Sequence, residues 1–516
     1  MSKKITIGLI TLFLFIVGVN SLISKNSLID LKALIPLKIK ELIPLKIKEY
    51  IKSNFLSKNE IIELNRMIEA QYKQMDQYEI QIKQLNKTIN EKNLQIDIYK
   101  LKEKRDFQIF INEYSRNFIK NSEELIFTKS DDVIYQINNK NYKLSKFYFP
   151  WLDKSGNRFY IRKFENYLII FTGFGDLIYA NLDDFKKENN VHFKKIELKF
   201  PKKHVFDSDH PIFKDFLIFK NKIYISFLSK YEDNCIANTI VVGEMNFNNI
   251  LLDDFFKTND CNYKFSGQTG GKLGKFLDDK ILFSVGDASY WEEWEENKRN
   301  LIPFDQKRSY DASQNLESHL GKVLSINVEN KDIEILSMGH RNVQGIYYDN
   351  VNNQIFLSEH GPKGGDELNL IDLNNNNRNK NFGWPIVSHG EHYKYNETTY
   401  KYAPLKKPHG DFGFQEPLIS FNKRVAPGNL TLANKFANNQ KDKLVVYLGG
   451  MGKSYGENKL HQSLVKLVFD NKMNHLSTHA IPIKARIRDV LYLEDLNELV
   501  LALESISSIG FLSEEK

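Results

Sequence analysis

From about residue 121 onward, bulky apolar residues alternate with polar ones over short runs, and turns rich in asparagine, aspartate or charge separate the runs. Alternation with a period of two predicts β-strands. The pattern repeats as a unit made of an apolar strand, a polar turn and a second strand of alternating bulky residues. The six units are Tyr160–Gly173, Phe216–Phe227, Gly274–Val285, Gly345–Ser358, Leu430–Gly449 and Val490–Leu503. We therefore predict that 121–516 is all-β, a six-bladed β-propeller with four strands in each blade.

A different period precedes the strands. Between Asn59 and Phe118 no glycine or proline interrupts the chain, and apolar residues recur at every seventh position. A sustained heptad pattern predicts a coiled coil over 57–118, and with it a homo-oligomer. Polar residues at the second seam position, Gln71 and Lys92, leave open a lone amphipathic helix that lies on the propeller. The apolar seam consists of Ile61, Ile68, Met75, Ile82, Ile89 and Ile96.

The N-terminal pattern is that of a membrane segment. Lys3 and Lys4 precede an uncharged apolar run, Ile5–Ile23, whose roughly 19 residues are enough to span a bilayer. Positive residues ahead of such a run favour a cytoplasmic N-terminus. We predict a single-pass anchor over 1–23 in the inner (cytoplasmic) membrane, then a linker over 24–56 that carries LIPLKIKE twice in succession, with the propeller in the periplasm. The alternative is a cleaved signal peptide and a secreted protein.

Composition and charge change this picture little. Lysine and arginine number 72 against 65 aspartates and glutamates, and the net charge of +7 is spread along the chain. Because dispersed lysines are typical of a solvated surface, we predict no nucleic-acid partner. Aromatic residues make up 13% of the chain, which suits a large β protein. The two cysteines, Cys235 and Cys261, are either paired in an exported domain or left as free thiols.

Candidate chemistry is concentrated in the stretch Gly339–Trp384. There a Gly-His-Arg-Asn run precedes one predicted strand, and a second strand leads into a loop, Glu359–Glu367, that is rich in glycine and ends in two acids. Glycines allow a backbone to approach a ligand closely. A loop that presents carbonyls beside carboxylates suits a hard cation such as Ca²⁺. We expect the functional site at this loop, on one face of the propeller.

These residues resemble the glucose/sorbosone dehydrogenase family, the soluble propellers that use pyrroloquinoline quinone (PQQ). The family's pattern has a GHRNPQG-like run, an EHGPRGGDE-like run, an NYGWP-like run and an RxRD run near the C-terminus. The matching runs in this chain are Gly339–Gly345, Glu359–Glu367, Asn381–Pro385 and Arg486–Val490. The resemblance implies a propeller that binds PQQ and Ca²⁺ and oxidises a sugar or aldehyde.

The resemblance also implies roles for single residues. It assigns contacts with the quinone cofactor to Arg341, Asn342, Arg486 and Arg488. The two arginines of the RxRD run alternate along a strand, so they point the same way and can hold one carboxylate of PQQ together. The implied calcium ligands are the carbonyls of Gly361 and Pro362 for an ion beneath the quinone, and Glu367 with the backbone of Phe382 for a second, structural ion.

Two positions, Gln268 and Phe421, depart from the family pattern, and a third, Asp287, matches it. Gln268 stands where the family has its general-base histidine, and an amide cannot accept a proton at neutral pH. Phe421 replaces a tryptophan that covers the site and still offers a flat face. Asp287 is retained, and it and Arg341 are candidate catalytic residues. The acidic aromatic loop Ser289–Glu295 is either a solvated loop or the source of a substitute base or a sugar-stacking surface.

Two classes of function therefore remain. The first is a membrane-anchored, PQQ-dependent sugar or aldehyde dehydrogenase with an altered base, which transfers a hydride from sugar C1 to the cofactor and passes electrons to a periplasmic acceptor. The second is a non-catalytic propeller that serves as a membrane-tethered binding or scaffold module. The retained arginines favour the first class, and Gln268 favours the second.

Overall fold

The computed structural model describes residues 125–137, 140–149, 158–204, 212–231, 235–260, 268–288, 312–375, 380–391, 405–436, 443–452 and 460–515. All of them belong to one compact unit of the chain. The predicted anchor (1–23), linker (24–56), coiled coil (57–118) and acidic aromatic loop lie outside these residues. No helix among the residues described is long and apolar enough to cross a membrane.

The regular secondary structure of the described residues is almost entirely β, as predicted, and one sheet holds eleven of the strands. Along this sheet the strands follow the order β26 (Ile487–Leu493), β27 (Glu498–Leu503), β28 (Ser508–Glu515), β3 (Lys140–Tyr148), β1 (Leu125–Lys129), β7 (Asn190–Lys199), β6 (Leu177–Asn181), β5 (Tyr167–Thr172) and β4 (Phe159–Phe164). Two further strands pair at its side, β2 (Val133–Ile137) with β3 and β11 (Asn249–Leu251) with β7.

Four smaller sheets hold the other strands that the structure describes. The first contains β12 (Asp253–Lys257), β10 (Ile236–Glu244), β9 (Lys222–Lys230) and β8 (Phe213–Phe219). The second contains β13 (Gly270–Phe276), β14 (Lys280–Val285), β15 (Lys322–Asn327), β16 (Ile333–Met338) and β20 (Lys380–Asn381). The third contains β17 (Val343–Asp349), β18 (Gln354–Glu359), β19 (Asp366–Asp372) and β21 (Ile419–Phe421). The fourth contains β22 (Pro427–Leu432), β23 (Lys443–Gly450), β24 (Leu464–Asp470) and β25 (His475–Ile481). Short helical turns are α4 (Asp184–Lys187), η4 (Gly410–Phe412) and η5 (Glu504–Ile506).

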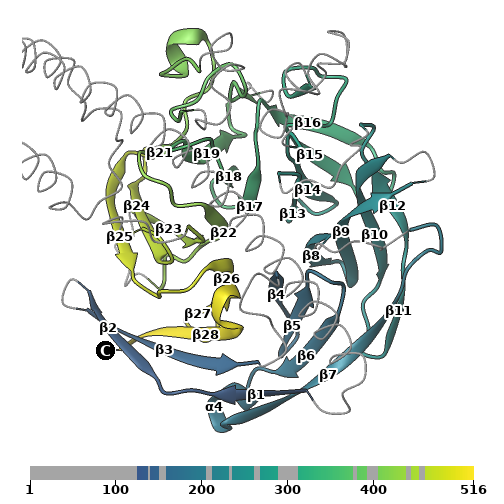
Figure 1. The fold of residues 1–516 in the computed structure, drawn as a ribbon, viewed down its shortest axis with the longest axis vertical. Coiled ribbons are helices and arrows are strands. Elements are labelled where there is room, and N and C mark those ends of the chain that lie inside the picture. Colours follow the sequence, from purple (N-terminus) through teal and green to yellow (C-terminus); the bar gives the residue numbers. More distant parts are fainter. Residues whose placement is uncertain are drawn as a thin grey trace, which may run out of the picture. The chain divides into compact units, whose positions relative to one another are not determined.

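The sheets are arranged radially about a common centre, which gives a propeller-like fold (Figure 1). One strand of each predicted repeat lies innermost, and each inner strand contacts the next around the centre, in the order β4, β8, β13, β17, β22, β26 and back to β4. The predicted repeats coincide with these inner strands and their hairpin partners. The longest buried apolar runs lie in the hairpin partners, such as β5, β9 and β23. The sheets do not separate into six, since β4 and β26 belong to the same eleven-stranded sheet.

Most inner strands contain an irregularity near their start. The pairing register shifts in β8 between Phe213 and Asp215, in β17 between Val343 and Gly345, and in β26 between Ile487 and Asp489; β13 and β22 show the same feature. A bulge redirects the side chain of the extra residue. The ring of inner strands therefore turns a set of side chains toward one end of the central axis.

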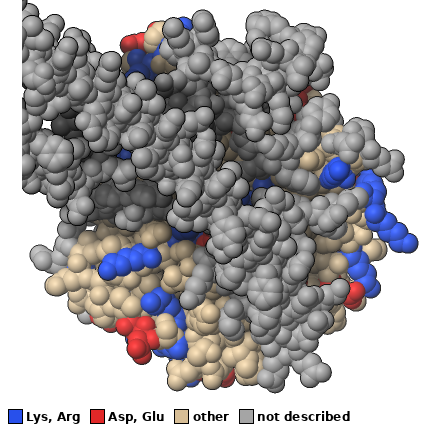
Figure 2. Space-filling model, viewed as in Figure 1, with Lys and Arg blue, Asp and Glu red and all other residues tan. Residues whose placement is uncertain are grey.

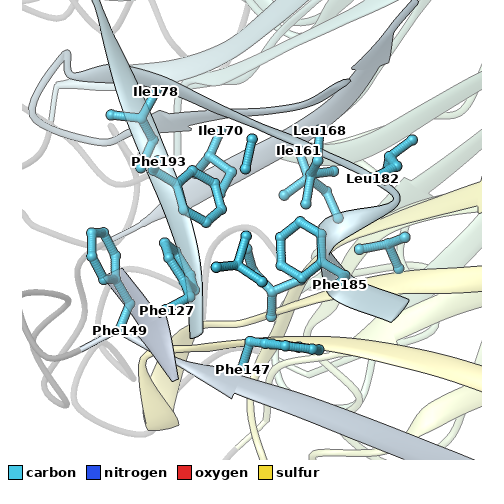
Figure 3. Packing of buried hydrophobic residues seen from close by; sticks show 14 of the residues in the cluster. Phe127, Phe147, Phe149, Ile161, Leu168, Ile170, Ile178, Leu182, Phe185 and Phe193 are labelled. Atoms are coloured by element: carbon cyan, nitrogen blue, oxygen red, sulfur yellow. The ribbon is translucent and has the colours of Figure 1, made fainter. Parts of the chain in front are cut away.

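Aromatic packing accounts for much of the hydrophobic core. In the cluster of Figure 3 the Phe127 and Phe149 rings stack with centroids 3.9 Å apart, and Phe147 meets Phe185 edge to face at 4.9 Å. Burial of each such ring stabilises the fold by about 1.5–3 kcal/mol. Among the described residues that are visible in Figure 2, lysine and arginine side chains appear at several separate places. Cys235 is buried and disulfide-bonded, so it is not a free thiol; Cys261 lies outside the described residues.

Candidate functional site

The stretch rich in candidate chemistry folds into β17, β18 and the loops at one end of these strands. Gly339 has a φ of +72°, and a Cβ atom there would lie 2.3 Å from Asn381 Oδ1. Only glycine fits this contact. The glycine therefore fixes where the Gly-His-Arg-Asn run enters β17.

Glu359, the last residue of β18, holds this run in place. Its buried carboxylate accepts the backbone N–H groups of Arg341 and of Asn342, the latter at 3.3 Å. It also forms a hydrogen bond of 2.8 Å with His340 Nδ1 and accepts one of 3.0 Å from Asn369 Nδ2. Burial alone would raise the pKa of Glu359, but His340 and the backbone donors lower it overall. The carboxylate thus stays charged and positions the side chains of Arg341 and Asn342.

Arg341 and Asp287, both predicted catalytic residues, lie together. The Asp287 N–H donates to the Arg341 carbonyl at 2.8 Å, and Asp287 Oδ2 accepts a hydrogen bond of 2.8 Å from Trp384 Nε1. The Arg341 guanidinium lies 5.5 Å from the centroid of the Trp384 ring, within the range of a cation–π interaction. The Gln268 carbonyl accepts the N–H of Ala288 at 2.9 Å, so the predicted base position borders the same group.

Asn342 is connected to the C-terminal arginines through a residue that the sequence analysis did not single out. Asn342 Oδ1 accepts hydrogen bonds from Gly270 N at 3.1 Å and from Gln344 Nε2 at 2.9 Å. Gln344 Oε1 in turn accepts a hydrogen bond of 3.3 Å from Arg488 Nη1. Two motifs that are 144 positions apart in the chain therefore meet at one site. Gln344 is the bulge residue of β17, so its orientation could not be read from a regular alternation.

Arg486 and Arg488 share one buried carboxylate, that of Glu504. Arg488 Nε donates to Glu504 Oε2 at 2.5 Å and Arg486 Nε donates to Glu504 Oε1 at 3.3 Å. Arg486 Nη1 also donates to the Met451 carbonyl at 2.6 Å. Burial alone would raise the pKa of Glu504, but the two arginines lower it. The two arginines therefore share one carboxylate of the protein, and Glu504 orients them.

The residues assigned to calcium by resemblance gather around one cavity. It is lined by Gly361, Pro362, Glu367 and Phe382, together with Gly339, Arg341, Glu359, Trp384, Val387, Ser388 and His409. Burial raises the pKa of Glu367 well above its usual value, and the nearby charges of Glu359 and Asp366 raise it further. His409 Nε2, 3.5 Å from Glu367 Oε1, has no hydrogen-bond partner within the part of the chain that is described.

Glu359 and Glu367 both line this cavity, and a cation beside Glu367 would favour the charged form that burial disfavours. Oxygen donors suit Ca²⁺. The Glu367 side of the cavity therefore fits a calcium ion. The Gly361 carbonyl fits less well, because it already accepts a hydrogen bond of 2.9 Å from the positively charged Arg341 Nη1. The Pro362 carbonyl accepts the Gly365 N–H at 2.9 Å. Among the residues described, no group of three or more His, Cys, Asp or Glu could hold a metal, so backbone carbonyls would have to contribute.

Phe421 and His360 serve packing in this structure. Phe421, on the edge strand β21, is 5% exposed and belongs to a core cluster with Phe356 and Leu368 rather than to the cavity lining. His360 forms a hydrogen bond of 2.8 Å with the Pro427 carbonyl. Burial, together with Arg341 and other nearby cations, lowers the pKa of His360 to about 3, so this imidazole is neutral.

The chain was compared with known proteins. A family model described as Glucose / Sorbosone dehydrogenase matches residues 210–505. An uncharacterized protein of Synechocystis sp. is 30% identical over 235 residues, which are 43% of this chain and 50% of that protein. Quinoprotein glucose dehydrogenase B of Acinetobacter calcoaceticus is 30% identical over 138 residues, 23% of this chain and 26% of that protein. The chain thus spans about half or less of the length of the curated relatives it matches. A crystal structure of a glucose dehydrogenase, 18% identical, superposes with a TM-score of 0.52 over 71% of this chain and 97% of that one, which shows the fold.

Proposed function

The chain belongs to the glucose/sorbosone dehydrogenase family, and on this premise we propose that it is a sugar dehydrogenase-like oxidoreductase that binds PQQ at the centre of the propeller. The observation that carries the proposal is the hydrogen-bonded series from Arg488 through Gln344 to Asn342. It joins the side chains that would contact the cofactor from two distant motifs. The name of the quinoprotein relative supports the same cofactor.

In this proposal each residue has a stated task. Arg486 and Arg488, oriented by Glu504, hold carboxylates of the cofactor. Asn342 and Arg341 face its ring from the other side. Bound PQQ supplies an acceptor for the two electrons that leave the sugar carbon. Glu367 and the backbone of Phe382 hold a structural Ca²⁺, and the carbonyls of Gly361 and Pro362 would hold a second ion only after Arg341 gives up its hydrogen bond to Gly361.

The proton that leaves the sugar hydroxyl needs an acceptor other than Gln268, since an amide does not accept a proton at neutral pH. Asp287 is one candidate, because it borders both Arg341 and the Gln268 segment. This departure also favours a second candidate function. A propeller that binds the cofactor or a sugar but has lost its base would serve as a binding or scaffold module.

Titration of the purified protein with PQQ in the presence of Ca²⁺ tests the proposal. Loss of one charge-assisted contact typically costs about 1.5–3 kcal/mol, so Arg488→Ala should weaken binding roughly ten- to a hundredfold. Lys163→Ala, a change at an exposed residue of β4, is the control and should leave binding unchanged. Calorimetry that shows no binding of PQQ to the unaltered protein would contradict a PQQ-dependent function and leave the binding module.

We further propose the arrangement in which this domain works. The ring of six inner strands supports six blades, with β26, β27, β28 and β3 as one blade and β4–β7 as its neighbour. The apolar segment Ile5–Ile23 supports a membrane anchor that leaves the propeller in the periplasm, where electrons would pass to an acceptor protein. The heptad pattern supports assembly into a homo-oligomer through 57–118.

A further inference from the structure

Two cations at the centre of the propeller have no counterpart in the motifs that identify the family. Lys214 is only 5% exposed, and Arg158 is partly buried just ahead of β4. Within the described residues, neither the Lys214 ammonium nor the Arg158 guanidinium has a hydrogen bond or an ion pair with another side chain. Buried charges in folded proteins are normally paired. Two buried cations without a paired anion among the described residues therefore need an explanation.

The strand bulges bring these cations to the same place as the arginine pair. Lys214 is the bulge residue of β8, and Arg488 is the bulge residue of β26. The strand between them is β4, which contacts both β8 and β26 and which Arg158 directly precedes. Arg158, Lys214 and Arg488 thus lie at the same end of three neighbouring inner strands. Their charges also interact, since each of Arg158 and Lys214 is destabilised by Arg488.

The next strand fixes the direction of the lysine. A Cβ atom on Gly271 of β13 would lie 2.4 Å from Lys214 Cβ and 2.7 Å from Lys214 Cγ. Gly271 has a φ of +92°. Glycine is therefore required both by the backbone conformation and by the lack of space for a side chain. The stem of Lys214 packs across this glycine, which prevents the side chain from turning outward over β13.

The charges of this cluster do not balance. Arg486 and Arg488 form ion pairs with Glu504, and Arg158 and Lys214 add two further positive groups. Burial, then Arg158 and Arg488, lower the pKa of Lys214 well below its usual value, and burial likewise lowers that of Arg158. Tyr160 contributes no charge at neutral pH, because burial raises its pKa to about 12. Among the described residues, Arg158 and Lys214 therefore have no carboxylate paired with them.

We propose that Arg158 and Lys214 form, together with Arg488, an anion subsite that takes a carboxylate of the ligand bound at the propeller centre. The inference rests on the proposed function, which it extends: the ligand must carry a carboxylate beyond those that Arg486 and Arg488 hold. That carboxylate comes either from the quinone cofactor itself or from an acidic sugar, such as a uronic acid, bound beside it.

The test compares Lys214→Met, which approximates the length of the stem and removes the charge, with Lys222→Met, a change at a partly exposed lysine on the neighbouring strand β9. Lys214→Arg is the variant that should preserve anion binding. Because Lys214→Met replaces a buried amine that is unpaired among the described residues with an apolar group, it should raise the melting temperature of the ligand-free protein, which also reports that the variant folds. PQQ affinity, measured by calorimetry with Ca²⁺ present, should fall about ten- to a hundredfold in Lys214→Met and stay the same in Lys222→Met.

Further measurements separate the possible outcomes. If Lys214→Met binds PQQ normally but loses affinity for glucuronate, the carboxylate belongs to the substrate. If the unaltered protein binds no PQQ but citrate raises its melting temperature, and citrate does not raise that of Lys214→Met, the result supports the anion subsite and contradicts the PQQ-dependent function. If Lys214→Met and the unaltered protein bind PQQ, glucuronate and citrate equally, the subsite is overturned, whatever the fate of the proposed function.

Discussion

Replacing Arg162 by leucine should destabilise the propeller strongly, because this one side chain joins three inner strands. From β4, Arg162 Nη1 lies 2.6 Å from Asp489 on β26, and Nη2 lies 2.7 Å from Asp215 on β8. Both aspartates are fully buried. Removal of one partner from a buried ion pair typically costs about 3–5 kcal/mol, since it leaves an uncompensated charge.

The remaining contacts place the expected loss near the lower end of that range. Asp215 keeps an ion pair of 3.0 Å with Lys272 Nζ and a hydrogen bond of 3.0 Å from Leu273 N. Asp489 keeps a hydrogen bond of 2.5 Å from Asn429 Nδ2. We therefore expect a loss of about 3 kcal/mol in the free energy of unfolding, measured by urea denaturation at pH 7.

The adjacent residue provides the control. Lys163 pairs with Asp495 at the surface, where ion pairs contribute about 0–1 kcal/mol, so Lys163→Leu should change the free energy of unfolding by less than 1 kcal/mol.

The dependence on pH sharpens the test. Burial alone would raise the pKa of Asp489, but Arg162 and Lys272 lower it overall. A carboxyl group whose pKa is lowered on folding stabilises the protein above the usual aspartate range and loses that contribution as pH falls through the folded-state value. In Arg162→Leu, Asp489 loses the largest cause of its lowered pKa, so it accepts a proton more readily and the deficit should shrink as the pH falls from 7 to 4. A deficit below 1 kcal/mol, or one equal to that of Lys163→Leu at every pH, would refute the reasoning.

Four further outcomes follow from the site and the sequence. Gln268→His should raise sugar turnover with PQQ bound, by up to about 10²–10⁴-fold; an unchanged rate would mean that another base already serves. Chelation of calcium should lower the melting temperature of the unaltered protein, and Glu367→Gln should abolish that calcium dependence; a chelator without effect would contradict the structural ion. A fragment spanning 57–118 should sediment as a dimer or trimer, and a monomer at micromolar concentration would oppose the coiled coil. Carbonate washing should leave the full-length protein in the membrane, whereas its release would exclude an anchor.

The fold could be predicted from the sequence to a useful degree because the second strand of each predicted hairpin is buried on both sides. Its apolar run, such as the one in β9 that ends near Phe227, stands out from the polar turns, and the predicted hairpins coincide with observed ones. The grouping into sheets could not be predicted, because the pairing of β28 with β3 depends on contacts between residues hundreds of positions apart.

The site was predicted where a contiguous motif carries it and missed where bulges or distant partners do. Arg341 and Asn342 belong to a recognisable run, but their positions depend on Glu359, which is one strand away. Gln344 and Lys214 are bulge residues, so their directions break the alternation from which side-chain orientation is read. Glu504 sits in a run with no chemical signature, and its role appears only when η5 brings it beneath the arginines.

The pairing of β3 with β28 has a consequence for the order in which the protein can be made. Eight residue pairs, from Ser508↔Tyr148 to Glu515↔Asn141, join a strand from the start of the described domain to its last strand. During synthesis β3 emerges long before its partner and waits with an unpaired edge. Contacts so distant in sequence slow folding, and an exposed strand edge invites association between chains. Until Ser508–Glu515 has been released, the early strands are therefore the part of the domain most open to such association.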